Sequence, residues 1–255
     1  MFKFTNKLIP VLNPVGEPFI ELTSVDSTNN YAMALVHEGM AQHGTAVFAH
    51  EQTQGKGQRQ KQWLAQQGQN LILSVVLATE ELPLSQAFTF SMAMALAAYR
   101  FFNKYAGEET RIKWPNDLYW RDRKAGGILI ENVVQGPHWK YAVVGMGINL
   151  NQTSFGGLNK AVSLKQITGR TFDTVALAKE LCTCIDHSFQ QLRQHKEIIP
   201  PAYHRHLYKR GEVVRLKKDS RVFEARIEGV SAAGQLITRH AAEEIFAIGE
   251  VEWVF

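Results

Sequence analysis

The sequence predicts an α+β fold in which helices flank a mixed β-sheet, followed by a small C-terminal β-barrel. Two long stretches, 85–105 and 174–194, carry apolar residues at helical spacing. Short apolar strands and hairpin turns are interspersed with them, which favours a mixed sheet. From about Tyr208 the chain shows only short strands and turns, as expected for a small barrel. We therefore predict a larger domain over residues 1–206 and a smaller one over residues 207–255.

The first part of the chain alternates short strands with helices. Residues 19–22 form an apolar strand, and Asp26-Ser27-Thr28-Asn29 is typical of a turn and helix N-cap ahead of a helix over 31–38. Two further apolar runs, 45–49 and 70–77, are expected to be strands. The first long helix is rich in alanine, so it is expected to pack closely against the sheet.

The stretch 111–131 gathers lysines, carboxylates and a pair of glycines that core packing does not require. Pro115 pushes the residue before it toward extended geometry, so the strand 111–114 should end at the Asn116-Asp117 turn. A short aromatic strand, 118–120, follows that turn. These residue types suit a nucleotide phosphate with a carboxylate-held metal. A solvated hairpin with a bulge at the glycines is the structural alternative.

A long apolar strand over 125–134 completes this stretch, and side chains alternate between the two faces of a strand. Alternation predicts that one face carries Lys124, Gly126, Ile128 and Ile130. A glycine inside a strand often marks the close approach of a ligand or of another backbone.

The rest of the sequence predicts one strand, one long helix and the barrel. The strand 141–144 is expected to end at Gly145-Met146-Gly147, and an amphipathic helix follows over 174–194. The barrel strands are expected at 213–216, 221–230, 235–239 and 245–253. Because fewer than about 50 residues make only a marginal core, the barrel should dock onto the larger domain.

A polar segment rich in glycine and glutamine, 52–70, lies between two predicted strands. Its centre, 55–63, combines two glycines, three cationic side chains and Trp63. Successive backbone N–H groups in such a turn can cradle a phosphate, although no Gly-Lys-Ser/Thr opens a helix as in a Walker A loop. A long loop of this kind is more often a functional lid than filler. The alternative is a disordered surface loop.

Composition narrows the classes of function. With 45% hydrophobic and 20% charged residues the chain is typical of soluble globular proteins, and its longest apolar run is too short for a membrane span. The N-terminal residues do not resemble a secretory signal. Cys182 and Cys184 are the only cysteines, too few for a disulfide framework or a zinc site. A cytoplasmic protein is therefore predicted.

The formal charge of +4 calls for an acidic partner. A nucleotide, an acidic protein or a nucleic acid would satisfy it. The basic residues are spread along the chain, and no nucleic-acid-binding signature accompanies them. A nucleotide-handling enzyme is favoured over a basic nucleic-acid-binding module.

Four motifs occur together in the chain. They are Ser27-Thr28-Asn29; Gln52-x-x-Gly55-Lys56-Gly57 with Trp63; Lys113-Trp114-Pro115-Asn116-Asp117 with Lys124 and Gly127; and Gly145-x-Gly147-Ile148-Asn149. In their order and spacing the sequence resembles the biotin–protein ligases, over about residues 19–253. The resemblance implies a class II synthetase-like catalytic domain that binds biotin and ATP over 1–206, and an SH3-like domain over 207–255.

The reaction implied by this resemblance has two steps. The carboxylate of biotin attacks the α-phosphate of ATP, giving biotinyl-5′-AMP and pyrophosphate. A specific lysine of a biotin carboxyl carrier protein, as in acetyl-CoA carboxylase, then attacks the mixed anhydride to form an amide. Mg²⁺ would accompany ATP, and no dedicated protein cage for a metal is visible, as expected for this ion.

The family's site residues are carried onto this chain motif by motif. Biotin would be bound by Ser27, Thr28, Asn29, Gln52, Lys56, Gly57, Gln58, Lys124 and Gly127. ATP and the adenylate would be bound by Lys56, Arg59, Trp63, Asn116, Lys124 and Asn149. The implied catalytic residues are Lys124 at the carboxylate and phosphate, Lys113 near the phosphate, Asp117 at the incoming lysine, and Arg59 in the lid.

Two departures from the family pattern stand out. Family members usually carry glycine where this chain has Gln60, and often arginine where it has Gln58 or Lys61. Our hypothesis is that Lys56, Arg59 and Lys61 share the work of retaining the intermediate. The second departure is that Ser27 lies too near the start for a preceding DNA-binding domain, so a ligase-only form without DNA binding is expected. A homodimer is compatible with the sequence.

The nearest enzyme alternative is a lipoate- or octanoate-type protein ligase of the same fold. Such an enzyme should show a different arginine- and glycine-rich motif and should lack the Lys-Trp-Pro-Asn-Asp sequence. From a different class, a basic nucleic-acid-binding module would be revealed by binding that weakens steeply with salt.

Overall fold

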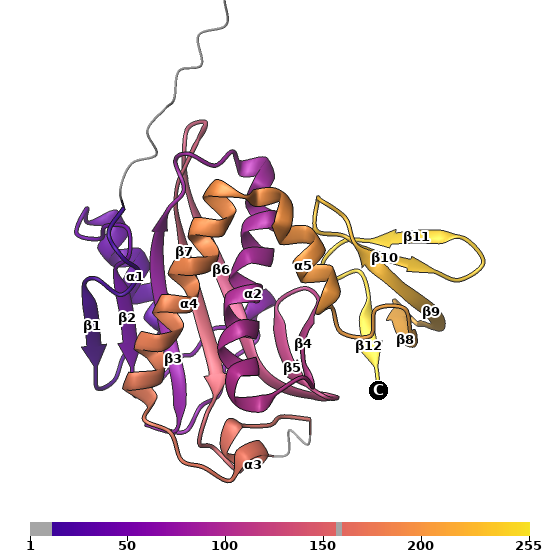
Figure 1. The fold of residues 1–255 in the computed structure, drawn as a ribbon, viewed down its shortest axis with the longest axis horizontal. Coiled ribbons are helices and arrows are strands. Elements are labelled where there is room, and N and C mark those ends of the chain that lie inside the picture. Colours follow the sequence, from indigo (N-terminus) through magenta and orange to yellow (C-terminus); the bar gives the residue numbers. More distant parts are fainter. Residues whose placement is uncertain (1–11, 157–159) are drawn as a thin grey trace, which may run out of the picture.

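A seven-stranded mixed sheet forms the centre of the larger part of the molecule (Figure 1). The structure is a computed structural model that describes residues 12–156 and 160–255. The strands are β1 (Phe19–Leu22), β2 (Ala46–Ala49), β3 (Asn70–Ala78), β4 (Thr110–Lys113), β5 (Asp117–Trp120), β6 (Arg123–Gln135) and β7 (His138–Asn149). Their order is β1-β2-β3-β7-β6-β5-β4. β1 and β2 pair in parallel and the other neighbours are antiparallel, so the predicted mixed sheet is confirmed.

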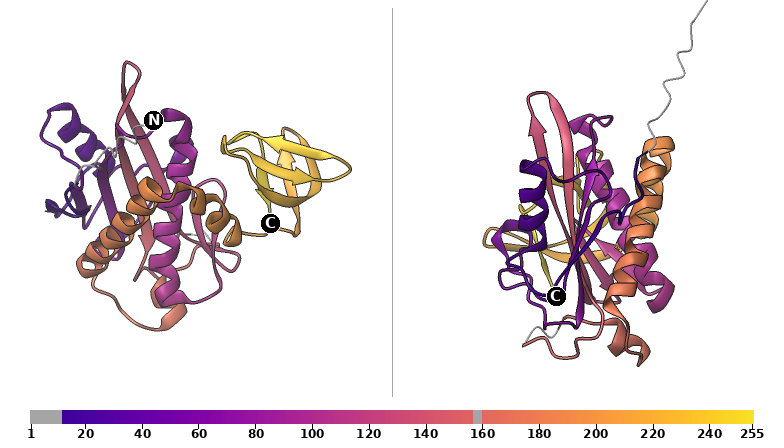
Figure 2. Two further views of the ribbon diagram at one scale, coloured as in Figure 1. Left: turned by 45° about the horizontal axis from the view of Figure 1, so that its top comes forward. Right: turned by 90° about the vertical axis from the view of Figure 1, so that its left-hand side faces the viewer.

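Helices cover both faces of this sheet. α2 (Ala87–Ala106) and α4 (Thr174–Gln194) lie on one face and α1 (Thr28–His37) on the other, as Figure 2 shows. Asp173 caps α4, because its side chain accepts hydrogen bonds from the N–H groups of Val175 and Ala176. Two short helices, α3 (Leu164–Thr168) and α5 (Ile199–Arg205), complete the set in the described ranges. None of the helices described is long and apolar enough to cross a membrane.

Strand β3 is buried on both faces, which explains its almost continuous apolar sequence. Leu73, Val75 and Leu77 belong to the large core that includes α2 and α4. Val76 packs instead with Ala32 of α1 in a smaller cluster on the opposite face. Ser74 is the polar exception in the middle of this strand, and it is fully buried.

A β-bulge in β6 overturns the predicted alternation of side chains around Lys124. The pairing of β5 with β6 shifts between Leu118 and Tyr119, which face Gly126 and Lys124 respectively. The extra residue, Ala125, moves Lys124 to the other face of the strand. The Lys124 ammonium therefore lies over Gly127, whereas Ile128 and Ile130 pack in the core.

Two further predictions about element ends were wrong. β7 does not end at Val144 but runs through Gly145 and Gly147 to Asn149. α1 begins at Thr28 rather than at Tyr31, with Ser27 in the N-cap position and making no side-chain cap. The Thr28 and Asn29 side chains are thereby held in the first helical turn, facing the sheet.

The C-terminal part is a five-stranded antiparallel sheet, as predicted for a small barrel. Its strands are β8 (Val213–Lys218), β9 (Arg221–Val230), β10 (Leu236–Arg239), β11 (Glu243–Phe246) and β12 (Glu252–Val254), in the order β11-β10-β9-β8-β12. Its buried residues belong to the same hydrophobic cluster as the main core. The Trp114 indole N–H also donates to the carbonyl of Gly234 at 2.9 Å. The barrel therefore docks as expected, while a domain boundary at 206/207 stays a prediction.

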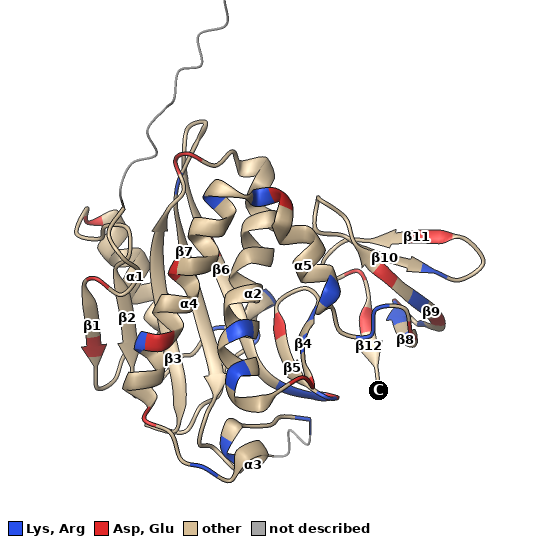
Figure 3. Ribbon diagram, in the orientation of Figure 1, with Lys and Arg blue, Asp and Glu red and all other residues tan. Residues whose placement is uncertain are grey.

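Charged side chains are distributed over both parts of the chain. Figure 3 shows lysines and arginines interspersed with acidic residues on the large sheet, the helices and the barrel. This distribution agrees with the sequence, in which the basic residues are spread out. It gives no support to a single basic stripe of the kind that binds nucleic acid.

Candidate active site

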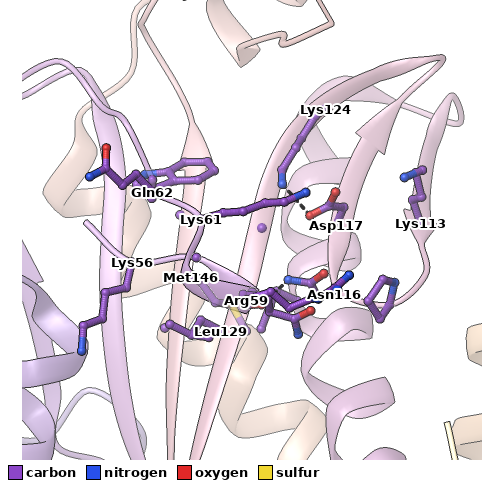
Figure 4. A pocket seen from close by; sticks show the side chains of 18 of the residues that line it. Lys56, Arg59, Lys61, Gln62, Lys113, Asn116, Asp117, Lys124, Leu129 and Met146 are labelled. Carbon is purple, nitrogen blue, oxygen red and sulfur yellow. Dashed lines mark hydrogen bonds and ion pairs between the residues drawn. The ribbon is translucent and has the colours of Figure 1, made fainter. Parts of the chain in front are cut away.

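A cavity of about 410 Å³ lies between the α1 face of the large sheet, the segment 55–63 and the end of the barrel. Part of it is shown in Figure 4. It is lined by nearly all of the residues predicted for the site: Ser27, Thr28, Asn29, Gln52, Lys56, Gly57, Gln58, Arg59, Trp63, Lys113, Asn116, Asp117, Lys124 and Gly127. Gly145 and Gly147 of the fourth motif also line it, so residues from all four motifs are brought to one place.

One wall of the cavity is an ion pair between neighbouring strands. The Lys124 ammonium lies 2.6 Å from the Asp117 carboxylate. The bulge in β6 makes this pair, because it turns Lys124 to the face on which Gly127 leaves room for its side chain. Asn116 fixes the preceding turn by donating from Nδ2 to the carbonyl of Ile128 at 2.7 Å. In Figure 4 Lys61 also points toward this pair.

Lys113 is a buried cation held among aromatic rings. It is only 8% exposed. Its ammonium lies 5.1 Å from the ring centre of Tyr119, 5.0 Å from that of Trp253 and 5.5 Å from that of Phe255. Burial lowers the pKa of Lys113 to about 8; nearby Asp117 opposes this lowering and Lys124 adds to it. The barrel therefore supplies part of the environment of a motif lysine.

A buried polar network around the start of α1 forms another part of the cavity lining. The Thr28 N–H donates to Gln52 Oε1 at 2.8 Å. Asn29 Nδ2 donates to Glu131 Oε2 at 2.7 Å. The Ser74 hydroxyl lies 2.6 Å from Asn29 Oδ1 and 2.7 Å from the Thr28 hydroxyl.

The two glycines of β7 make room for side chains that form the cavity. A Cβ atom at Gly145 would lie 2.2 Å from Asn29 Oδ1, and one at Gly147 would lie 2.4 Å from the Trp63 indole. Contacts this short do not occur, so any larger residue would displace Asn29 or Trp63. The Gly-x-Gly sequence therefore provides close approach inside a strand rather than a turn.

The segment 55–63 is an ordered loop folded over the cavity. The Gly57 N–H donates to the carbonyl of Lys61 at 2.7 Å, and Trp63 donates to Gly55 at 2.9 Å. Arg59 and Gln60 have positive φ angles of 55° and 61°. Gln60 therefore occupies a left-handed conformation that glycine adopts more easily.

Two cations of this loop are directed away from the ion pair. The Arg59 guanidinium lies against the backbone of Gly249 in the barrel, where an added Cβ would be 2.6 Å from it. The Lys56 ammonium donates to the Asn30 side chain. Of the three cations expected to share the lid's work, only Lys61 points toward Lys124 and Asp117 (Figure 4).

Asn149 does not line the cavity, in contrast to its predicted place at the adenylate. It is 4% exposed. Its Nδ2 donates to the carbonyl of Val162 at 3.1 Å and more weakly to that of Lys124 at 3.4 Å. β7 continues as a strand up to Asn149. The Asn149 side chain is therefore held beside the backbone of Lys124, which it supports.

The sequence reasoning missed two groups of residues at this site. Ser74 and Glu131 belong to the polar network, and their signal was visible: each is a polar residue inside an apolar strand. Gly249, Trp253 and Phe255 line the cavity from the barrel. No local pattern marks them, because their role depends on how the barrel docks.

The described ranges 12–156 and 160–255 contain no group of three or more histidine, cysteine, aspartate or glutamate residues able to hold a metal ion. Asp117, a carboxylate of the cavity lining, is paired with Lys124. The donor set therefore suits a metal that arrives with phosphate ligands better than a metal held by protein alone.

Known proteins resemble this chain in sequence and in fold. The Bifunctional ligase/repressor BirA of Bacillus subtilis is 29% identical over 185 residues, which is 71% of this chain and 56% of that protein. The Biotin–[acetyl-CoA-carboxylase] ligase of Paracoccus denitrificans is 37% identical over 132 residues, which is 51% of this chain and 53% of that protein. The chain thus spans about half the length of the curated relatives it matches.

Among solved structures, the biotin protein ligase from Aquifex aeolicus in complex with biotin and ATP has the same fold. It superposes with a TM-score of 0.76 at 24% identity, covering 91% of this chain and 97% of that one. Residues 21–149, which include all four motifs, match the Biotin/lipoate A/B protein ligase family. On this match and on the shared fold, the chain belongs to the biotin/lipoate A/B protein ligase family.

Proposed function

We propose that this chain activates biotin with ATP to give biotinyl-5′-AMP and pyrophosphate. It then transfers the biotinyl group to a lysine of a biotin carboxyl carrier protein, such as that of acetyl-CoA carboxylase. The names of the relatives support this proposal, since two of them are biotin ligases and a third is a ligase and repressor.

The observation that carries the choice of biotin is the buried polar network beside the cationic wall. Ser27, Thr28 and Asn29 are each at most 3% exposed, and all three line the cavity. The cyclic urea of biotin has N–H donors and a carbonyl acceptor that can pair with such groups. The dithiolane of lipoate and the chain of octanoate have neither. Buried polar groups left unpaired beneath them would cost about 1–3 kcal/mol each.

In the first step a biotin carboxylate oxygen attacks the α-phosphorus, and the bond to pyrophosphate breaks. Two anions must approach each other, so fixed positive charge is required. Lys124 is proposed at the carboxylate and phosphate, with Lys113 and Lys61 nearby. A lysine about 4 Å from the reacting charge, at an effective dielectric of about 20, contributes about 4 kcal/mol. Mg²⁺ would be held mainly by the nucleotide's phosphates and by water.

In the second step the acceptor lysine attacks the biotinyl carbonyl, and AMP leaves. Asp117 is proposed to orient this lysine and to accept its proton. Its pairing with Lys124 supports the assignment, because one carboxylate then lies beside the residue that binds the acyl phosphate. Once Lys124 engages the acyl phosphate, Asp117 is available to the incoming ammonium.

The loop over the cavity is proposed to shield the mixed anhydride from water. Trp63 supports this role, because it lies over Gly147 and its indole N–H is buried without a hydrogen-bond partner in the described part of the chain. Lys56, Arg59 and Lys61 would share the retention of the intermediate. If neutralising all three left the rate of adenylate release unchanged, this role would have to be abandoned.

The remaining assignments at the site are proposals of the same kind. Gln52, Gly57, Gln58 and Gly127 would contact biotin, and Asn116 would contact the nucleotide. Asn149 would act indirectly through the backbone of Lys124. A cytoplasmic location, a homodimer and the lack of a DNA-binding role stay predictions from the sequence.

The test is biotin-dependent ATP–pyrophosphate exchange. The wild-type chain should exchange label only when biotin is present, and Lys124→Ala should lower the rate by about a thousandfold. Glu21→Ala is a suitable control, because Glu21 lies on the sheet outside the cavity. An absence of exchange in the wild type, or undiminished exchange in Lys124→Ala, would overturn the proposal.

A further inference from the structure

We infer that Glu131 is a positioning residue that sets the polarity of the biotin pocket. The inference rests on the proposed function and adds a residue that does not itself line the cavity. Glu131 lies in β6, opposite Val143 of β7. Its side chain is linked to the pocket through Asn29, whose Nδ2 donates to its carboxylate at 2.7 Å.

The carboxylate fixes the orientation of the Asn29 amide. A carboxylate only accepts hydrogen bonds, so Asn29 must turn its NH₂ group toward Glu131. Asn29 Oδ1 then faces Ser74, whose hydroxyl oxygen is 2.6 Å away. Gly145 leaves the space in which this amide lies. The orientation would be ambiguous without the carboxylate, since an amide offers donors on one side and an acceptor on the other.

The orientation of Asn29 in turn decides where the hydroxyl protons lie. Asn29 Oδ1 cannot donate, so the single proton of Ser74 must be directed at it. The Thr28 hydroxyl has one proton and two oxygen neighbours, Ser74 Oγ at 2.7 Å and Gln52 Oε1 at 3.1 Å. The shorter contact takes the proton, because the Ser74 proton is already used and Gln52 Oε1 already accepts from the Thr28 N–H at 2.8 Å. The direction of each hydrogen bond in this series follows from the one before. Every donor in the series is directed toward the Glu131 side.

This direction of the hydrogen bonds fixes which donors and acceptors face the cavity. With its proton directed at Ser74, the Thr28 hydroxyl presents lone pairs and acts as an acceptor. Gln52 uses Oε1 to accept from the Thr28 N–H at 2.8 Å, so it offers its Nε2 donors. An acceptor beside a donor matches the N–H and the carbonyl of a cyclic urea. If these hydrogen bonds ran in the opposite direction, the Thr28 hydroxyl would be a donor facing the urea N–H.

The experiment measures the KM for biotin and the KM for ATP in pyrophosphate exchange. Glu131→Ala and Ser74→Ala each interrupt this series of hydrogen bonds. Neither residue lines the cavity. Each should raise the KM for biotin by about 10- to 100-fold, as for a buried hydrogen-bonding group facing the wrong partner. The KM for ATP should change by less than about twofold. Because both substitutions interrupt the same series of hydrogen bonds, the KM for biotin of the double variant should be little higher than that of either single variant.

Rescue distinguishes polarity from packing. Glu131→Gln keeps an oxygen that can accept from Asn29, so its KM for biotin should lie within about fivefold of the wild-type value. Glu21→Ala, a carboxylate change elsewhere on the same sheet, should leave both constants unchanged. If Glu131→Ala does not fold, Ser74→Ala and Glu131→Gln still give the two arms of the comparison.

The possible failures are separable. Wild-type chain that shows no biotin-dependent exchange would refute the proposed function, and this inference with it. Active wild type combined with an unchanged KM for biotin in Glu131→Ala and Ser74→Ala would refute the inference alone. Equal increases in the KM for biotin and the KM for ATP would also refute it, because they would indicate a general loss of structure.

Discussion

Replacing Lys113 by methionine should make the protein more stable while it damages the site. Lys113 is 8% exposed, and burial lowers its pKa from 10.5 to about 8. A lowering of this size means that folding destabilises the charged form by about 3 kcal/mol. Contacts with the rings of Tyr119, Trp253 and Phe255 offset about 1 kcal/mol of this cost. Methionine fills a similar volume without a charge, so Lys113→Met should raise the free energy of unfolding by about 2 kcal/mol at pH 7.

The sign of the pH dependence follows from proton binding. Between about pH 8 and pH 10.5 the unfolded chain keeps Lys113 protonated while the folded chain releases the proton. The unfolded state therefore binds more protons in this window, and wild-type stability rises with pH. The advantage of Lys113→Met should be complete below about pH 8 and should shrink as the pH rises toward 10.5.

Urea denaturation at pH 7.0 and at pH 9.5, chosen to lie on either side of the change, measures this difference. Lys56→Met is the matched control, because Lys56 lines the same cavity but is exposed. Its stability should stay within about 0.5 kcal/mol of wild type. A Lys113→Met variant that is no more stable than wild type at pH 7, or a gain in stability that does not change with pH, would show that the buried charge of Lys113 does not destabilise the fold.

Three further outcomes are expected. Gly147→Ala places a Cβ atom 2.4 Å from the Trp63 indole, so it should lower kcat/KM in exchange by about 10- to 100-fold; unchanged kinetics would show that Trp63 is not needed where it lies. Asn149→Ala should lower kcat/KM by about tenfold through the backbone of Lys124, and an unchanged value would remove that supporting role. In the wild type, kcat/KM for ATP should fall above about pH 8 as Lys113 loses its charge, and Lys113→Arg should remove this fall. A fall that persists in Lys113→Arg would assign it to another group.

The residues that line the cavity were largely predictable because their motifs are local in sequence. Each motif combines residue types that core packing does not require, such as the Lys-Trp-Pro-Asn-Asp stretch and the glycine-rich loop. The mixed sheet and the barrel followed from apolar periodicity and turn residues, which act over a few residues. These parts of the prediction needed no knowledge of long-range contacts.

The parts that were wrong or missed depend on long-range pairing. The face on which Lys124 lies is decided by one extra residue, Ala125, whose bulge exists only in the pairing with β5. The strand 141–144 was expected to end at Gly145 and Gly147, but here the glycines continue the strand because neighbouring side chains need the space. Two of the three rings around Lys113, those of Trp253 and Phe255, come from the end of the barrel about 140 residues later in the chain.

We propose that this cavity activates biotin in preference to other carboxylic acids. The most direct measurement incubates the wild-type chain with ATP, Mg²⁺ and equal concentrations of biotin, lipoate and octanoate, and identifies the acyl-adenylates by mass spectrometry. We predict biotinyl-5′-AMP as the dominant product, and its loss in Lys124→Ala. Lipoyl- or octanoyl-AMP as the dominant product would contradict the assignment of biotin as the substrate.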